Sequence, residues 1–174
     1  MVKHLLLLSG ALGVFLQFYY TYHLPPHVAT HFGAGGLPNG WMSREGNLAL
    51  SVCVFVFNTL FFFFLPAIVR KLPTRLISFP KRDYWFSPEK REETLHLTTP
   101  WIHAIGFITN LFLMGVFHLA FLANLEKPPK LDERSFFLML GLYLLTVAIY
   151  TALIYRRFGK VPKKEGDIRR ISPS

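Results

Sequence analysis

Four long runs of apolar residues without a charged side chain divide this chain of 174 residues. Because an α-helix rises about 1.5 Å per residue, roughly 20 such residues cross the ~30 Å hydrocarbon layer of a membrane. A helix satisfies its backbone polar groups internally, which an isolated strand in lipid cannot do. The pattern therefore predicts an all-α integral membrane protein with four transmembrane helices, over about residues 5–22, 48–69, 100–125 and 135–155.

We expect residues 1–160 to form a single four-helix transmembrane domain, followed by a disordered basic cytoplasmic tail over residues 161–174. The first run ends without a small-x-small cleavage pattern, so we expect an uncleaved first helix rather than a signal peptide. The alternative is a soluble helical bundle. We disfavour it because little chain remains to cover four apolar cylinders.

The placement of basic residues predicts the orientation. With both termini in the cytoplasm, 15 of the 19 Lys and Arg residues lie on the cytoplasmic side, which is the usual bias of membrane proteins. The N- and C-termini and the loop between the second and third helices are therefore expected inside. The net charge of +9 follows from this bias and suits anionic lipid head groups. We expect no nucleic-acid partner, because no nucleic-acid-binding motif accompanies the basic residues.

The first loop, expected to be extracytoplasmic, is rich in proline and glycine. Two prolines can begin a short helix, and glycines can end it, so we predict one or two helical turns over residues 25–32 and a compact turn series after them. On such a helix His27 and His31 would share a face and could bind zinc, with His23 or Glu45 as a third ligand. The alternative is that His31 supports the glycine-rich turn. We favour this alternative, and we expect no metal and no cofactor.

The second loop, expected inside, contains an aromatic cluster of Tyr84, Trp85 and Phe86. Ser87 and Pro88 follow, which are residue types typical of a helix start. We therefore predict a helix from Pro88 towards the third span, with the aromatic residues anchoring this segment in the membrane interface. The alternative is a docking surface for a cytoplasmic partner or a lipid head group.

Polar residues within the predicted spans are costly in lipid and therefore informative. At about 100° per residue, His103, Asn110 and His118 fall within a third of the circumference of the third helix, and Gln17 and Asn58 could face them. A proton path or a polar ligand pocket is one interpretation. We favour hydrogen bonds between helices, which contribute roughly 0.6–2 kcal/mol each.

Both loops carry residues in an order that resembles a known family. In the outer loop these are Leu24, Pro25, His31, Phe32, Gly36, Pro38, Asn39 and Trp41. In the inner loop they are Pro80, Asp83, Tyr84, Trp85, Pro88, Glu89, Arg91 and Glu93. The chain thus resembles the family known as domain of unknown function 1648, relatives of the Sdp-type toxin immunity proteins. The resemblance implies a multi-span protein of the bacterial cytoplasmic membrane with the first motif outside, and immunity or signalling in the characterised branch.

We therefore predict a small polytopic membrane protein that acts by protein–protein or lipid interaction, as an accessory subunit or an immunity- or signalling-like protein. Its expected partners are membrane lipids and other membrane protein subunits or a second copy. The alternative is an intramembrane metal-dependent enzyme or transporter that uses His27 and His31, or His103 and His118. We favour the first class because the sequence contains no visible nucleophile–base pair, carboxylate dyad or nucleotide-binding loop.

Overall fold

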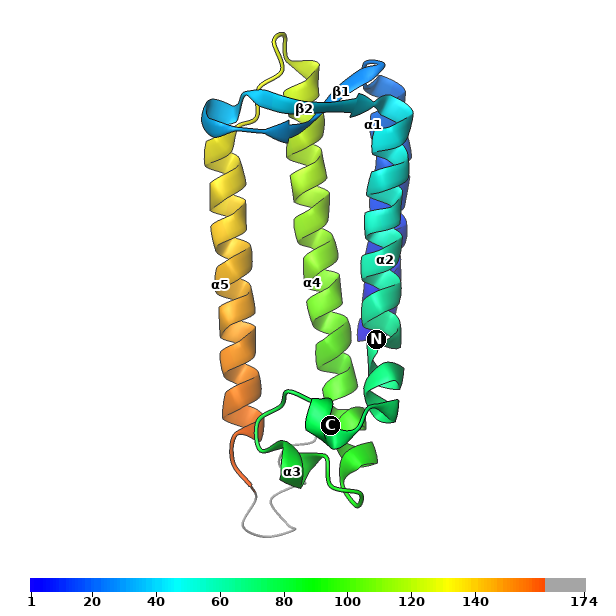
Figure 1. Ribbon diagram of the computed structural model, residues 1–174, viewed down its shortest axis with the longest axis vertical. Coiled ribbons are helices and arrows are strands. Elements are labelled where there is room, and N and C mark those ends of the chain that lie inside the picture. Colours follow the sequence, from blue (N-terminus) through cyan, green and yellow to red (C-terminus); the bar gives the residue numbers. More distant parts are fainter. Residues whose placement is uncertain (162–174) are drawn as a thin grey trace.

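The computed structural model describes residues 1–161, and these are mostly helical. The four long helices run side by side along the molecule (Figure 1), and each is long and apolar enough to cross a membrane. They are α1 (Val2–His23), α2 (Arg44–Lys71), α4 (Arg91–Leu125) and α5 (Glu133–Phe158). Each predicted span lies within one of these helices, so the prediction of four such helices is confirmed. The predicted basic tail, apart from Val161, lies outside the described residues.

The outer loop contains a β-hairpin, which the sequence analysis did not predict. Strand β1 (His27–Phe32) pairs antiparallel with β2 (Pro38–Ser43), and the 3₁₀ turn η1 (Ala34–Gly36) joins them. The predicted helical turns over residues 25–32 are therefore wrong. An isolated helical turn fixes many dihedral angles for few hydrogen bonds, whereas the hairpin pairs the same backbone groups across two strands.

Gly35 and Gly36 allow the chain to reverse between the strands. Their φ angles are +76° and +72°, in the left-handed region that glycine adopts without steric cost. The prediction of a compact glycine turn therefore matches the observed turn, although the segment before it is extended rather than helical.

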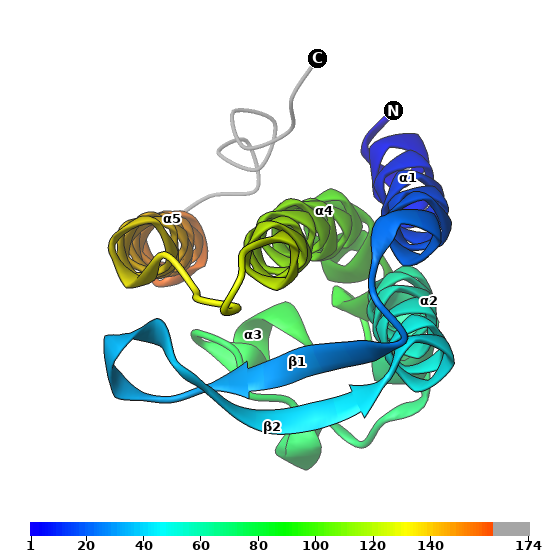
Figure 2. The same cartoon turned by 90° about the horizontal axis from the view of Figure 1, so that it is seen from above.

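Helices α1, α2 and α4 form a closely packed group, while α5 packs mainly on α4 (Figure 2). Small residues allow the close approach, because a Cβ atom added at Gly10, Gly13 or Gly106 would collide with a side chain of the facing helix. The rings of Phe112 and Tyr143 stack at 4.2 Å and join α4 to α5. Helices α2 and α5 leave one side of α4 uncovered, and the hairpin crosses this side at the outer end (Figure 2). We call it the open side.

The inner loop folds beneath the opposite end of the helices (Figure 1). It contains η2 (Thr74–Leu76) and the short helix α3 (Arg82–Trp85). The helix predicted from Pro88 begins at Arg91 as α4, after a turn in which the N–H groups of Lys90 and Arg91 both donate to the Ser87 carbonyl. Helix α4 then continues without interruption through Pro100.

Candidate functional site

The hairpin, residues 27–43, forms a strap across the outer end, and Asn124 on α4 fixes its first strand. Asn124 Oδ1 accepts a hydrogen bond from the Ala29 N–H at 2.7 Å, and Asn124 Nδ2 donates to the Ala29 carbonyl at 2.9 Å. The side-chain amide thus pairs with Ala29 as a neighbouring strand would, where the register of the hairpin shifts. Ala29 is 1% exposed, so loss of this pair would leave buried backbone groups unsatisfied.

The tip of the strap docks on the loop between α4 and α5. The Leu131 N–H donates to the Gly36 carbonyl at 2.9 Å. Gly36 is buried, and a Cβ atom there would collide with the Leu131 carbonyl oxygen. Two constraints therefore favour glycine at position 36: the positive φ angle and the close approach of the Leu131 backbone. As a result the strap, which follows α1 and precedes α2 in the chain, reaches across the bundle to the α4–α5 loop.

The residues of the outer motif divide into a buried and an exposed group. Leu24 is 5% exposed and packs with Tyr20 of α1 and with Val28 of the strap itself. Trp41 is 54% exposed. Among the others, Gly36 is buried, Phe32 and Pro38 are half-buried, and Pro25, His31 and Asn39 are exposed.

The two histidines of the strap lack the geometry on which the zinc alternative rested. In a strand, four residues span roughly 13 Å, against about 6 Å in a helix, so His27 and His31 on β1 do not lie one turn apart. His31 lies against Gly40 on the neighbouring strand. Among residues 1–161 no group of three or more His, Cys, Asp or Glu side chains could hold a metal ion. The helical argument for a zinc site is therefore wrong.

Asn110 joins three helices in the middle of the bundle. It is fully buried, and its Nδ2 donates to Ser9 Oγ of α1 at 3.0 Å and to Thr59 Oγ1 of α2 at 3.1 Å. Its Oδ1 accepts from Asn58 Nδ2 at 2.8 Å. This arrangement is the kind of interhelical hydrogen bonding that the sequence analysis favoured over a proton path.

The other polar residues of the spans lie at separate heights. His118 Nδ1 is 3.0 Å from the Tyr20 hydroxyl of α1, and the His103 ring stacks on Phe63 of α2. Fifteen residues of helix separate the two histidines, or roughly 22 Å, so they cannot share one metal ion. Gln17 is buried at 3% exposure, and its Nε2 has no hydrogen-bond partner within the described part of the chain.

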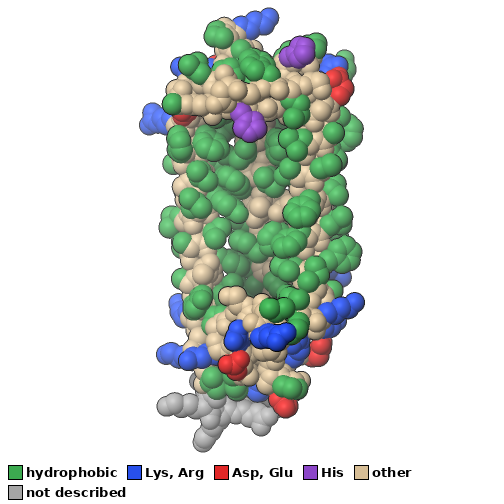
Figure 3. All heavy atoms as spheres, viewed as in Figure 1, with side chains coloured by type: hydrophobic (Ala, Val, Ile, Leu, Met, Phe, Trp, Pro, Cys, Tyr) green, Lys and Arg blue, Asp and Glu red, His purple; other side chains and the backbone are tan. Residues whose placement is uncertain are grey.

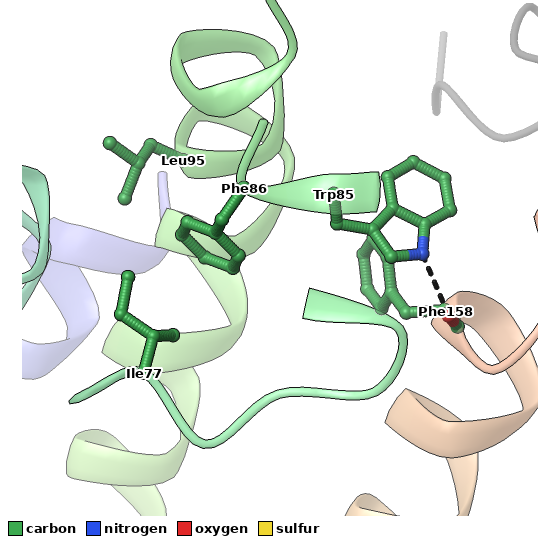
Figure 4. Packing of buried hydrophobic residues seen from close by; sticks show 5 residues of the cluster. All are labelled: Ile77, Trp85, Phe86, Leu95 and Phe158. Atoms are coloured by element: carbon green, nitrogen blue, oxygen red, sulfur yellow. Dashed lines mark hydrogen bonds between the residues drawn. The ribbon is translucent and has the colours of Figure 1, made fainter. Parts of the chain in front are cut away.

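The inner end is closed by a cluster of buried apolar side chains, which we call the inner plug: Ile77, Trp85, Phe86, Leu95 and Phe158. Trp85 points towards the end of α5 and donates from Nε1 to the Phe158 carbonyl at 2.7 Å (Figure 4). Trp85 and Phe86 are 2% and 3% exposed. They are therefore packed inside the protein. The sequence analysis had instead predicted that they anchor this segment in the membrane interface.

Arg91 ties the inner loop to the end of α2. Its guanidinium donates to the carbonyls of Val69, at 2.8 Å, and Leu72, and to Thr74 Oγ1 at 3.2 Å. A cation is favoured there, because the carbonyl groups at a helix C-terminus carry partial negative charge.

The remaining residues of the inner motif lie towards the surface. Hydrogen bonds from its own backbone N–H and from Ser87 hold the pKa of Glu89 below its usual value. Tyr84 and Pro80 are half-buried, and Asp83, Pro88, Glu89 and Glu93 are exposed.

An apolar cavity of about 380 Å³ lies next to the inner plug, between α4 and α5. Helix α4 contributes Trp101 and Ile105, and α5 contributes Val147 and Tyr150. Val69 of α2 also lines it, so the cavity lies at the inner end of the open side. Neither this cavity nor Asn124 was found by sequence reasoning, because both depend on residues that are distant along the chain.

Residues 7–56 match the family described as Domain of unknown function (DUF1648). The match covers most of α1, the whole strap and the first part of α2, and so includes every residue of the outer motif. No curated protein and no solved structure is significantly similar to the chain. The match and the four candidate spans agree with a small membrane protein.

Proposed function

Since residues 7–56 match the DUF1648 family, we propose that the chain is a member of it, and that it is a small integral protein of the bacterial cytoplasmic membrane that acts by binding another membrane protein. In this function it is an accessory subunit, and its partner is a helix of another chain or of a second copy. The observation that supports this proposal is the open side of the bundle between α2 and α5.

Helix α5 is the least buried of the four. No residue in its most apolar stretch is buried, whereas 28% of those in α1 are. In lipid the hydrophobic effect does not drive helices together, so association depends on close packing and hydrogen bonds. A helix held mainly along one edge by α4 therefore leaves surface for a further helix.

The side of α5 that faces the opening can be identified from its contacts. Tyr143 stacks on Phe112 and so marks the side towards α4. At about 100° per residue, Leu144 and Val147 turn to one side of Tyr143, and Leu142 turns to the other. Val147 lines the cavity together with Val69 of α2, so Leu144 lies on the open side and Leu142 on the opposite side.

A photo-crosslinking amino acid at Leu144 tests the proposal, with the same substitution at Leu142 as the matched control. Both side chains are similarly exposed, at 56% and 58%. We expect a crosslinked polypeptide from Leu144 in intact membranes, and none or much less from Leu142. Mass spectrometry of the product distinguishes a second copy from another chain. Crosslinks to lipid alone, or equal polypeptide crosslinking from both positions, would contradict the proposal.

The orientation belongs to the same proposal, with both termini and the inner plug in the cytoplasm. Basic residues gather at the end of the molecule that holds the inner loop (Figure 3), which agrees with the usual bias. In a Cys53→Ala background, a cysteine at Leu37 should react with a membrane-impermeant thiol reagent from outside. A cysteine at Ser78 should react only after the membrane is opened. Both positions are exposed, and labelling from the same side would exclude four spans with this orientation.

A further inference from the structure

The sheet of the strap has two edges, and the chain closes only one of them. Strands β1 and β2 form a two-stranded sheet, and no further strand lies beside β2 within residues 1–161. At the edge of β1, the side chain of Asn124 takes up both backbone groups of Ala29. The edge of β2 has no such cover, and we call it the open edge.

The hydrogen-bond pattern identifies which backbone groups lie on the open edge. In an antiparallel pair, residues that exchange hydrogen bonds alternate with residues whose N–H and C=O groups point away from the partner strand. The Arg44 N–H donates to the Pro26 carbonyl at 2.9 Å. Three positions further along, Ala29 lies opposite Trp41, so this pair is of the second kind, in agreement with the bonds of Ala29 to Asn124. The N–H and C=O groups of Trp41 therefore point out of the open edge.

The open edge lacks most of the features that prevent strands of different molecules from pairing. Exposed edges are usually protected by charged side chains, prolines or bulges. No residue of β2 (Pro38–Ser43) is charged. Its proline is the first residue and lies opposite Phe32, and the irregular register is confined to the part of the sheet between Ala29 and the tip. The edge is therefore regular at Trp41, whose side chain is 54% exposed.

The position of the sheet favours a second copy of the chain as the partner. Seen along the bundle, β2 lies on the side of the strap away from α4 (Figure 2), so the open edge points sideways. A two-fold axis parallel to the bundle would bring the β2 strands of two copies together antiparallel, with both copies in the same orientation in the membrane. Such two-fold contacts are the commonest in oligomers, and two uncharged edges bring no like charges together.

From the open edge, its uncharged strand and its sideways position we propose that two copies pair through β2 into one continuous antiparallel sheet, with Trp41 opposite Trp41 of the second copy. Each Trp41 N–H donates to the other Trp41 carbonyl, and the two side chains are neighbours, with Cβ atoms about 4.5–5.5 Å apart. The inner loop reaches the same side at the other end (Figure 2), so the two open sides face each other. The inference rests on the proposed partner binding, because it names the partner and locates the contact at the strap.

Disulfide crosslinking tests this pairing in intact membranes. In a Cys53→Ala background, Trp41→Cys keeps the backbone groups of the open edge, and we expect a covalent dimer on oxidation, since disulfides join Cα atoms roughly 4.4–6.8 Å apart. Tyr22→Cys is the matched control. Tyr22 lies near the end of α1 at the same end of the molecule, away from the open edge, and is 84% exposed, so random collisions would crosslink it as readily. No dimer from Trp41→Cys, or equal yields from both positions, would overturn the proposal.

A second pair of variants separates backbone pairing from contact between the rings. Trp41→Pro removes the N–H group on the open edge but none that faces β1, whereas Trp41→Ala keeps it. Energy transfer between copies labelled at the C-terminus measures dimerisation in vesicles. We expect Trp41→Pro to dimerise about tenfold more weakly than Trp41→Ala, because each dimer loses two hydrogen bonds. Equal dimerisation of the two variants would contradict backbone pairing.

Hydrogen exchange tests the proposal without any variant, and so also covers the case that Trp41→Pro does not fold. As the protein density in the vesicles rises and dimers form, exchange at the Trp41 amide should slow several-fold. Exchange at the Met42 amide should not change, because Met42 already pairs with Val28 on β1. A Trp41 amide that exchanges at the same rate at all densities would overturn the proposal.

The inference and the proposed function can fail separately. If Leu144 crosslinks only to a different polypeptide and Trp41→Cys gives no dimer, the strand pairing is wrong while the partner-binding function stands. If Trp41→Cys gives the dimer but Leu144 crosslinks to no polypeptide, the strand pairing stands and the helix-binding function is wrong.

Discussion

The strap and the inner plug close the two ends of the same bundle by different means. The strap is held at Ala29 and Gly36 by directed hydrogen bonds with Asn124 and Leu131, respectively. The inner plug buries large aromatic and aliphatic side chains against the end of α5. Hydrogen bonds fix geometry but each contributes little net free energy, whereas burial of a large side chain contributes several kcal/mol. We therefore expect the inner end to determine global stability and the outer end to determine local geometry.

Removal of Trp85 should have the largest effect. Trp85→Ala removes a side chain that is 2% exposed and leaves the Phe158 carbonyl without its partner, so we expect a loss of about 3–5 kcal/mol in the free energy of unfolding. Unfolding by denaturant in mixed micelles measures it. The neighbouring and half-buried Tyr84, changed to Ala, is the control and should cost clearly less. Equal losses would show that the inner plug does not depend on Trp85.

Asn124→Ala should act on the strap alone. It leaves the buried N–H and C=O groups of Ala29 unpaired, at a cost of about 1–3 kcal/mol. Hydrogen exchange at the Ala29 amide should accelerate, while global unfolding should change less than in Trp85→Ala. Asn39→Ala is the control, because Asn39 belongs to the outer motif but is exposed. If Asn39→Ala accelerated this exchange as much as Asn124→Ala, the side-chain clamp would not be what holds the strap.

The two glycines of the turn allow a sharper comparison within the strap. Gly35→Ala and Gly36→Ala both place a side chain at a positive φ angle, which costs about 1 kcal/mol or more. Only Gly36→Ala also meets Leu131, since nothing lies within 4 Å of a Cβ atom at Gly35. Hydrogen exchange at the Leu131 amide should therefore accelerate in Gly36→Ala only. The same exchange rate in both variants would mean that the tip is not docked on the α4–α5 loop.

The smallest effects are expected at the histidines of the strap. His31 packs against Gly40 but is exposed, so His31→Ala should cost less than about 1 kcal/mol, and His27→Ala should be almost silent. Hydrogen exchange in β2 measures the difference. If these residues bound zinc, stoichiometric zinc would slow that exchange, and either alanine variant would abolish the effect.

The long helices were predictable because an uncharged apolar run has few structural options in lipid. The strap was not, although Val28 and Thr30 are β-branched residues two positions apart and a glycine pair follows, which is a hairpin signal. The prolines before it are also typical of a helix start, and this second pattern led to the wrong element. The residues that hold the strap gave no local signal, since 95 positions separate Ala29 from Asn124.

The inner motif shows a different limit of sequence reasoning. Trp85 was singled out as an interface anchor, but an aromatic residue near a span end is as compatible with a protein interior as with a membrane interface. Its burial depends on Phe158, which is 73 positions away. The pairing of Asn58 with Asn110 could be anticipated from the sequence, because both are polar residues in predicted spans with few partners available.

The strap and the inner plug together limit how the proposed partner helix could reach the open side. The strap crosses it at the outer end and the inner loop lies beneath it (Figure 1), so both aqueous routes are obstructed and the remaining approach is lateral, through the bilayer. Encounters are then confined to two dimensions, and their frequency depends on the surface density of the partner in the membrane. Water-soluble molecules would compete poorly for such a surface, whatever their intrinsic affinity.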